Sequence, residues 1–415
     1  MSWRYEDGGP QRRQLVHGGL HLGPGDHLEV TTRVAPAATM VVTDEAGAFY
    51  LLRHTAGDGA IALVERIDPV TLEPLAQSPE LAAGPVWPGG LGVAPDGAVH
   101  VVFGSHAHRL DADLQPTHTA RLPRDRPYNS FVTLADGHLV TKDFGGSLPT
   151  HHVSAADRQP CELVVLAPDD LTIVARHVVP EASIARLSAD GDTVYVVGDT
   201  HLFRLHWDGA GLTRDEAFTA RYRTLEGQTY GWDCVLAAGA AWFLDDGEGS
   251  EHYTGTLRGH GVSTAPLHLV RVDLATAEVA TVEVCGLPGG LVANPPVVDE
   301  ARGVVVGYDS GNGVLAGFDL DTLDVRWRHD QDHGGHLLLY TATGEVVTGD
   351  HADVVVRDVV SGDELARVDA GMGIQSVLFP CPGGARDFYV CTFLGVSRIA
   401  VAGPGTGGRA EGAGL

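Results

Sequence analysis

The feature that most constrains the fold is a strand–turn–strand pattern that occurs eight times along the chain. Each copy has a strand of alternating residues, a turn about seven residues after the strand begins, and a second strand. The copies begin at Thr39, Gly89, Asn129, Ser183, Gly231, Asn294, His336 and Gln375. Their spacing of roughly 40–60 residues is typical of propeller blades of four strands each. We therefore predict an all-β, eight-bladed β-propeller of four-stranded antiparallel blades, with seven blades as the alternative.

A second signature marks the turn between the third and fourth strands of a blade. It consists of an apolar residue followed by Asp-x-x-Thr, and it occurs with the pairs Asp68 and Thr71, Asp273 and Thr276, and Asp319 and Thr322. A looser copy has an Arg before Asp358, with Ser361 as the hydroxyl residue. The Asp is expected to accept hydrogen bonds from turn amides and the hydroxyl to add a second local bond, so these residues have a structural role.

The eighth copy supplies only three strands before the chain ends in a glycine-rich stretch. The segment HLEVTTRV, residues 27–34, alternates and has no partner of its own. We predict that it completes the last blade, which closes the ring and removes two exposed strand edges. The chain is then one propeller domain over residues 26–403, with a flexible N-terminal tail over 1–25 and a disordered C-terminal tail over 404–415.

One segment resembles a known superfamily. GFDLDTLDVRW, residues 317–327, is similar to the docking pattern A-x-D-x-x-T-G-x-x-x-W of the PQQ-like, quinoprotein-type eight-bladed propellers. Asp319, Thr322 and Trp327 match the pattern, whereas Gly317 and Leu323 depart from it. The resemblance implies the propeller fold. Quinoprotein dehydrogenases with this fold are usually exported, and this chain shows no export signal, so PQQ is not expected as a cofactor.

A shorter stretch resembles the gluconolactonase/regucalcin-like propellers. Asn129 stands seven residues before an Asp-Gly turn, as in the N-G-x-x-x-S-P-D-G stretch of that family. In that family the Asn, together with an Asp at the head of another innermost strand, binds a divalent metal on the axis. Here Asp233 is the candidate Asp. The departures are the Ser after Asn129, the five-residue spacing from Asp233 to its turn, and the six blades of that family.

The repeat itself predicts a polar ring on the axis. If the first strand of each copy is innermost, its first residue lies at the mouth of the central channel, and these residues are mostly polar. Hard oxygen ligands for Ca²⁺ or Mg²⁺ would come from Asn129, Asp233, Asn294 and Gln375, while His336 would admit Zn²⁺, Mn²⁺ or Fe²⁺. The alternative is a ring that holds only ordered water.

The loops between second and third strands are expected on the same face as this ring. Two of them, residues 143–160 and 245–266, are long, and long loops in a compact domain are usually functional or disordered. The candidate acids and bases are Asp143, His151, His152 and His252, and the candidate substrate-binding residues are Tyr128, Trp232, Tyr253 and Asp245. The structural alternative is that Asp residues at strand ends, such as Asp199, Asp309 and Asp350, only accept hydrogen bonds from turn amides.

Composition excludes several classes of partner. The formal charge of −26, from 54 acidic against 28 basic residues, disfavours nucleic acids and anionic membranes. The N-terminal stretch has no apolar run of signal-peptide length, and no segment is long enough for a membrane helix. Five cysteines without C-x-x-C spacing are typical of reduced thiols, and they favour a cytoplasmic protein.

These features lead to three functional hypotheses. The leading one is a cytosolic, metal-assisted hydrolase of the lactonase type, or a lyase, which acts on a small organic molecule through a bound divalent cation. The competing hypothesis is a non-catalytic propeller that binds a ligand or a protein. The third is a quinone-dependent oxidoreductase. The sequence does not indicate the oligomeric state.

Overall fold

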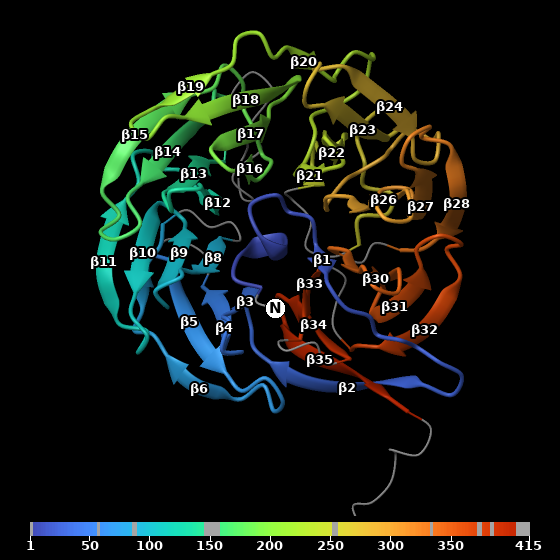
Figure 1. The fold of residues 1–415 in the computed structure, drawn as a ribbon, viewed down its shortest axis with the longest axis horizontal. Helices are drawn as coiled ribbons and strands as arrows, with labels where there is room; N and C mark the ends of the chain where they lie inside the picture. The colour runs from blue at the N-terminus through green and yellow to red at the C-terminus, as the bar shows by residue number, and fades with distance from the viewer. Residues whose placement is uncertain are drawn as a thin grey trace, which may run out of the picture.

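The computed structural model shows a ring of eight four-stranded antiparallel sheets around one axis (Figure 1). The structure describes residues 3–55, 59–84, 89–144, 158–250, 256–332, 335–371, 376–381 and 386–403. The predicted eight-bladed propeller is confirmed and the seven-bladed alternative is wrong. Among the described residues, the one helical element is the short 3-10 helix η1 (Glu6–Gly8), and no helix is long and apolar enough to cross a membrane.

In the first four blades, the innermost strand is the first strand of each predicted copy. From the axis outward, the first two blades contain β3 (Ala38–Thr43), β4 (Phe49–His54), β5 (Ile61–Ile67) and β6 (Pro74–Gln77) with β7 (Leu81–Ala82), then β8 (Gly90–Val93), β9 (Val99–Phe103), β10 (His106–Leu110) and β11 (Pro116–Arg121). The next two contain β12 (Tyr128–Thr133), β13 (Leu139–Asp143), β14 (Glu162–Leu166) and β15 (Ile173–Val178), then β16 (Ser188–Asp190), β17 (Thr193–Val197), β18 (His201–Trp207) and β19 (Leu212–Arg214) with β20 (Ala220–Arg221).

The remaining blades repeat this order. The fifth and sixth contain β21 (Val235–Ala237), β22 (Ala240–Leu244), β23 (His268–Asp273) and β24 (Val279–Glu283), then β25 (Val297–Asp299), β26 (Val304–Asp309), β27 (Val314–Asp319) and β28 (Val325–Asp330). The seventh contains β29 (Leu338–Tyr340), β30 (Glu345–Asp350), β31 (Asp353–Asp358) and β32 (Glu364–Asp369), with β1 (Leu15–Val16) against its inner edge. The eighth contains β33 (Ser376–Pro380), β34 (Asp387–Thr392), β35 (Gly395–Ala402) and β2 (His27–Val34).

The ring closes through the strand that the sequence predicts. Strand β2 pairs antiparallel with β35 along its whole length, from His27 opposite Ala402 to Val34 opposite Gly395. Because strands from both ends of the chain share this blade, no edge of the ring is left open. The predicted closure of the last blade is confirmed.

The Asp-x-x-Thr turns also have the predicted role. Asp319 Oδ1 accepts hydrogen bonds from the amides of Asp321 and Thr322, at 3.1 and 3.0 Å, and the Thr322 hydroxyl accepts from the amide of Asp324. The same bonds recur at Asp68, Asp273 and Asp358. Leu323 occupies the position after the Thr with φ 63°, which is the left-handed conformation that a glycine there would adopt without strain.

Gly317, the other departure from the docking pattern, is explained by the tryptophan at its end. Trp327 on β28 donates from Nε1 to the carbonyl of Val359 in the next blade, at 3.0 Å. Its ring lies so close to Gly317 that a Cβ there would collide with it. The missing side chain on β27 therefore lets the tryptophan join blades six and seven.

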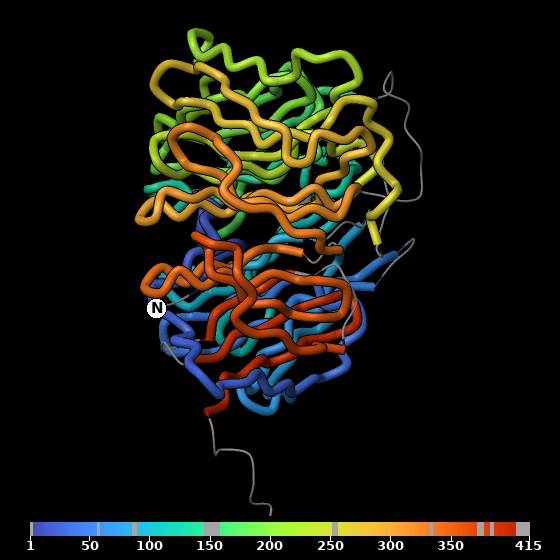
Figure 2. Tube along the Cα trace, turned by 90° about the vertical axis from the view of Figure 1, so that its right-hand side faces the viewer, coloured from blue at the N-terminus to red at the C-terminus, as the bar shows by residue number. Residues whose placement is uncertain are grey.

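The N-terminal residues lie inside the ring and do not form the flexible tail expected over residues 1–25. Trp3, Asp7, Arg12 and Leu20 are all buried. Figure 1 shows η1 in the centre of the ring, and Figure 2 shows the N-terminus at one face of the disc. We call residues 3–16 the axial plug. The tail was predicted because this segment has no strand alternation, but its carbonyls and charges have partners on the channel wall.

The contact between Trp327 and Gly317 gives a stability prediction. The substitution Gly317→Ala is expected to lower the free energy of unfolding by about 1–3 kcal/mol, because the added methyl group forces the ring of Trp327 away. Gly211→Ala is the control, since a Cβ at Gly211 meets no atom within 4 Å. Urea unfolding of both variants measures the difference. Equal midpoints for the two variants would show that Trp327 does not depend on Gly317.

Candidate functional site

The axial plug completes the hydrogen bonding of the inner strands. An innermost strand has one edge that faces the channel, and its amides there need acceptors. Five blades find them in the plug, with N···O distances of 2.8–3.0 Å. The amides are those of Thr43, Val93, Ala189, Leu236, Leu339 and Thr341, and the respective acceptors are the carbonyls of Trp3, Arg4, Pro10, Gln11, Gln14 and Val16.

The plug enters and leaves the channel by the same face. Trp3 bonds to the last residue of β3, and Val16 bonds to Thr341, which directly follows β29. Both contacts lie where inner strands end. Between them the plug turns at η1, close to the heads of the inner strands on the other side. The plug therefore closes the channel from one face. At the other end of the channel, the polar residues at the heads of the inner strands remain.

Arg12 holds the turn of the plug together. Its guanidinium lies 2.8 Å from Asp7 and 3.2 Å from Glu6, and it also donates to the hydroxyl of Ser130 and the carbonyl of Leu187. The arginine is only 1% exposed. Two acidic residues and one arginine of the plug thus neutralise most of their own charge inside the channel.

The wall of the channel supplies the other charges. His336 Nδ1 lies 2.7 Å from Asp7 Oδ1. Arg186 donates its backbone amide to Asp233 Oδ1 at 2.6 Å, while its Nη1 remains 3.7 Å from Asp233 Oδ2 and 3.9 Å from Asp7 Oδ2. Lys142 donates from Nζ to the carbonyl of Ser183 at 3.0 Å.

These neighbours set the protonation of the plug carboxyls in opposite directions. Burial raises the pKa of Glu6, and Arg12 and Arg186 only partly oppose this effect. Burial alone would also raise the pKa of Asp7, but His336, Arg12 and Arg186 together hold it below its usual range. Asp7 is therefore the firmly ionised member of the pair.

The described residues of the predicted polar ring are polar and buried, and one of them, His336, contacts the plug at Asp7. Thr39, Ser183, Asp233, Asn294 and His336 are all buried at or near the heads of inner strands. The side chain of Asn129 and the whole of Gln375 lie outside the described residues. Within the described part of the chain, no three His, Cys, Asp or Glu side chains gather closely enough to hold a metal. Because the set also includes amide residues and two of its five members lie outside the described residues, the metal site stays a prediction.

Four residues on adjacent blades retain polar atoms without a partner, and we call them the axial site. They are Ser183 and Arg186 before β16, Asp233 before β21, and Asn294 before β25. Ser183 Oγ, Arg186 Nη1, Asp233 Oδ2 and Asn294 Nδ2 are buried and form no hydrogen bond to any described residue. Buried polar atoms normally have partners, so this group indicates a polar occupant such as water or a ligand.

Asp143, a predicted catalytic residue, uses both of its carboxylate oxygens in contacts within the protein. It is completely buried, its Oδ2 lies 2.9 Å from Arg126 and 3.2 Å from Arg124, and its Oδ1 accepts from the amide of Glu162. An Asp at the end of a second strand can reach the first amide of the third strand, which explains this position. Asp309 accepts the amide of Asn312 in the turn that follows it, as the structural alternative predicted. Asp350 accepts the amide of Asp332 from the preceding blade, and Asp199 pairs with Arg158.

Asp245, a predicted substrate-binding residue, belongs to a buried cluster on blade five. Its carboxylate accepts from the amide and Nδ1 of His268, at 2.6 and 2.9 Å, and from Gln228 at 2.6 Å. Burial, followed by the charge of Asp245, raises the pKa of the adjacent Asp246 to about 7. Asp246 also accepts from the amide of Thr229, which begins the segment that leads to Asp233. The cluster is therefore hydrogen-bonded to the start of the segment that carries Asp233 of the axial site.

The other predicted substrate-binding and catalytic residues divide into two groups. Tyr128 is fully buried, its hydroxyl accepts from the amide of Arg124, and Trp232 packs in the core of blade five. Both side chains are therefore buried and contribute to packing. His151, His152, His252 and Tyr253 lie outside the described residues.

Sequence reasoning missed the charged residues of the plug and the cations of the wall. Glu6, Asp7 and Arg12 stand in a stretch with no strand pattern, and Arg186 and Lys142 have no spacing that links them to it. The one available signal was the close succession of acidic and basic residues in RYEDGGPQRR, which is unusual for a loose tail. The buried partner of Asp245, His268, opens a strand and could have been paired with it by register.

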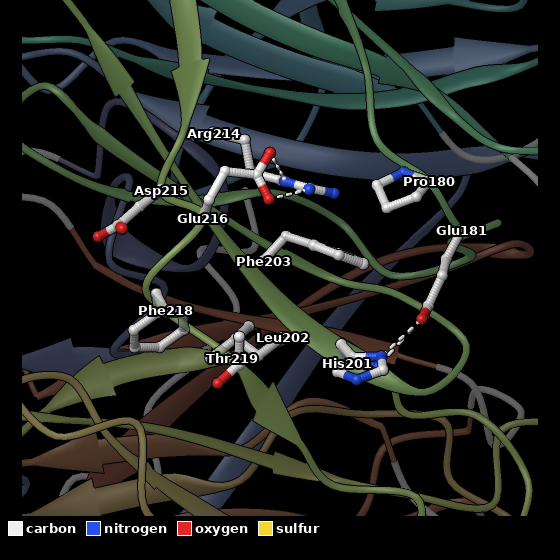
Figure 3. A pocket seen from close by; sticks show the side chains of 10 residues that line it. All are labelled: Pro180, Glu181, His201, Leu202, Phe203, Arg214, Asp215, Glu216, Phe218 and Thr219. Atoms are coloured by element: carbon white, nitrogen blue, oxygen red, sulfur yellow. Dashed lines mark hydrogen bonds and ion pairs between the residues drawn. The ribbon is translucent and has the colours of Figure 1, made fainter.

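A separate hollow of about 230 Å³ lies at the rim of blade four. It forms because β19 and β20 pair with different parts of β18 and leave a gap between them. Figure 3 shows Phe203 between two ion pairs, His201 with Glu181 at 2.7 Å and Arg214 with Glu216. Because these charges already have partners, the hollow presents no free polar group that would select a ligand.

Comparisons with known proteins support the fold. No family model and no curated protein matches the chain. Among solved structures, quinohemoprotein alcohol dehydrogenase from Comamonas testosteroni is 12% identical with a TM-score of 0.63, and the match covers 100% of this chain and 83% of that one. A europium-containing methanol dehydrogenase is 10% identical with a TM-score of 0.64, covering 94% and 89%. BamB from Moraxella catarrhalis is 14% identical with a TM-score of 0.56, covering 88% and 99%.

The fold is that of the PQQ-like eight-bladed propellers. Two expectations are corrected by the proteins that share it. The metal-assisted hydrolase or lyase is wrong, because the solved structures similar to this chain are quinoprotein dehydrogenases and BamB. The cytoplasmic location is also contradicted, because these similar proteins are extracytoplasmic. The fold is used by enzymes and by BamB, so it leaves both an enzymatic and a non-enzymatic function open for this chain.

The described axial residues of this chain do not fit a pyrroloquinoline quinone, the cofactor of quinoprotein dehydrogenases. That cofactor carries three carboxylates, which require unpaired cations or a bound metal. Here the guanidinium of Arg12 is held by Glu6 and Asp7, and the ammonium of Lys142 donates to backbone carbonyls. Among these axial cations, Arg186 has a nitrogen without a hydrogen bond, and the carboxylates of Glu6, Asp7 and Asp233 stand within 4 Å of its guanidinium.

The axial plug gives the first prediction for this region. Arg12→Met is expected to lower the free energy of unfolding by about 3–5 kcal/mol, because it leaves Glu6 and Asp7 buried without their shared cation. Arg13→Met is the matched control, since Arg13 and its partner Glu300 are both about two-fifths exposed and such a pair contributes about 1 kcal/mol or less. Urea unfolding followed by tryptophan fluorescence compares the variants. Similar losses for both would place the plug outside the channel.

The Asp246 cluster gives a pH prediction. Its pKa of about 7 in the folded protein lies above the ordinary value of 3.8, so stability falls as the pH rises from about 4 to about 7. Asp246→Asn removes this penalty and keeps an acceptor for Thr229. The variant should match the wild type near pH 4 and become more stable by up to about 4 kcal/mol above pH 8.

The control for this experiment is Glu248→Gln, an exposed carboxylate in the same loop. Chemical denaturation at several pH values between about 4 and 8 gives the difference for each variant. A constant difference between Asp246→Asn and wild type across this range would contradict the buried, protonated carboxyl.

Proposed function

We propose that this protein is a non-catalytic binding propeller that holds a small molecule at the axial site. The observation that carries the proposal is the set of unpaired buried atoms on Ser183, Arg186, Asp233 and Asn294. These atoms lie on three adjacent blades at the heads of inner strands, opposite the face that the plug closes. Leaving a buried polar group without a partner costs about 1–3 kcal/mol, so a ligand that satisfies several of them gains that free energy on binding.

The arrangement supports binding more than chemistry. Three described acids of this region, Asp7, Asp143 and Asp245, have strong partners and are buried, while Asp233 keeps one oxygen unpaired. A general acid or base must reach a substrate proton at hydrogen-bond distance, and these groups spend their bonds on the protein itself. What remains unpaired is a set of donors and acceptors, which is what recognition requires.

A quinone-dependent oxidoreductase is the second candidate, favoured by the TM-scores of 0.63 and 0.64 with two dehydrogenases. The paired cations of the axis argue against it. Since identities of 10–12% support the fold alone, the preference for the binding function rests on the chemistry of the described residues.

The experiment has two arms. In the first, purified full-length protein is incubated with pyrroloquinoline quinone and Ca²⁺, and the oxidation of primary alcohols is followed with an artificial electron acceptor. In the second, ligand-detected NMR screens amino acids, sugars, polyols and small organic acids against the wild type and Asn294→Leu. We expect no turnover in the first arm and at least one saturable ligand in the second.

The variant makes the second arm specific. Asn294 Nδ2 forms no hydrogen bond, so its replacement by leucine should leave the free energy of unfolding unchanged or raised while it weakens the ligand about tenfold. Quinone-dependent turnover would overturn the proposal, and so would the absence of any ligand that distinguishes the variant from the wild type.

A further inference from the structure

We infer that the axial site takes a neutral, polyhydroxylated small molecule, such as a monosaccharide or a cyclic polyol. This inference rests on the proposed binding function and adds the chemical class of the ligand. It follows from the spacing of the unpaired atoms and from the balance of charge around them.

The first observation is the gap between Arg186 and Asp233. Nη1 of the arginine and Oδ2 of the aspartate are 3.7 Å apart, which is too far for a hydrogen bond, and neither atom forms a hydrogen bond to another described residue. The other neighbour of Nη1 is Asp7 Oδ2, at 3.9 Å. A group that lies beside both atoms must accept from the guanidinium and donate to the carboxylate. A hydroxyl does both at once, whereas a carboxylate cannot donate and an ammonium cannot accept.

The remaining atoms of the axial site require the same versatility. Ser183 Oγ is both donor and acceptor, and Asn294 Nδ2 is a donor that needs an acceptor. The four unpaired atoms therefore alternate in hydrogen-bonding character across neighbouring blades. One ligand can satisfy them when it presents several hydroxyls in different directions.

The second observation is that the axis is already balanced in charge. Three carboxylates, those of Glu6, Asp7 and Asp233, face three cationic side chains, Arg12, Arg186 and Lys142, besides His336. A guest with a net charge would enter a buried region without a free counter-charge, which is costly. The surrounding protein has a formal charge of −26, which further disfavours an anion.

Ordered water is the simplest competitor, because a water molecule has the same dual hydrogen-bonding character as a hydroxyl. The distinction is whether a polyol displaces it. A ligand with several linked hydroxyls gains from each additional bond without a further loss of translational freedom, so saturable binding is expected only if the four atoms share one space.

The test is isothermal titration calorimetry on the full-length protein with four probes. D-glucose and myo-inositol are the neutral probes. D-glucuronate and D-glucosamine are the anionic and cationic analogues of D-glucose. We expect a neutral probe to bind at least tenfold more tightly than either charged analogue. Ser183→Ala and Asn294→Leu should each weaken that binding about tenfold without loss of folded stability, and Thr117→Ala on the outer strand β11 should leave it unchanged.

The outcomes separate this inference from the proposed function. If a charged analogue, or an amino acid or organic acid from the broader panel, binds best and responds to Asn294→Leu, the neutral class is wrong and the binding function stands. If no probe and no panel member binds, the site holds water only and both proposals fail. Quinone-dependent turnover would likewise overturn both. Polyol binding that Ser183→Ala and Asn294→Leu leave unchanged would place the ligand elsewhere and overturn the inference.

Discussion

The structure depends on the burial of a charged N-terminal turn in the centre of the ring. Arg12 inside a β-propeller channel would be costly alone, and so would Glu6 and Asp7, but the three together neutralise one another and donate to the wall. The same turn gives the inner strands the acceptors that their channel-facing amides lack. One segment thus solves two problems of an eight-bladed ring, namely the polar inner edges and the open axis.

This plug also changes what the axis can do. In an open channel, side chains at the heads of inner strands would be free to gather around a metal or an anionic cofactor. Here His336 is drawn to Asp7, and Arg186 stands between Asp7 and Asp233. The charges that could have served catalysis or anion binding therefore stabilise the plug. Four of the groups left unpaired, on Ser183, Arg186, Asp233 and Asn294, lie at or near the heads of inner strands, and Trp3 Nε1, Glu6 Oε1 and Gln14 Oε1 of the plug also form no hydrogen bond to a described residue.

Much of the fold was predictable because it follows from local rules. The eight strand pairs, the Asp-x-x-Thr turns and the closing strand β2 each depend on alternation or turn chemistry within a few residues. The polar ring at the heads of inner strands was also predictable, since the repeat places equivalent residues at equivalent heights. The position of the plug inside the ring was not predictable, because the contacts between Asp7 and His336 or between Arg12 and Ser130 join residues more than 100 positions apart without any shared pattern.

Asp143 was misassigned for a related reason. Its role depends on two arginines and one amide whose approach only the folded blade reveals.

The unpaired polar atoms at the heads of the inner strands are the strongest reason to look for a ligand. At the plugged end, amides of five blades find carbonyl partners within 3.0 Å, so the chain is able to satisfy polar groups on its axis. At the other end, four polar atoms on three adjacent blades remain without partners among the described residues. Apolar side chains at Ser183 and Asn294 would relieve part of that cost, and the positions further along the inner strands show that this chain uses valine and leucine freely on its inner strands. Polar residues that lower the stability of the fold at these positions are best explained by a role in binding a ligand.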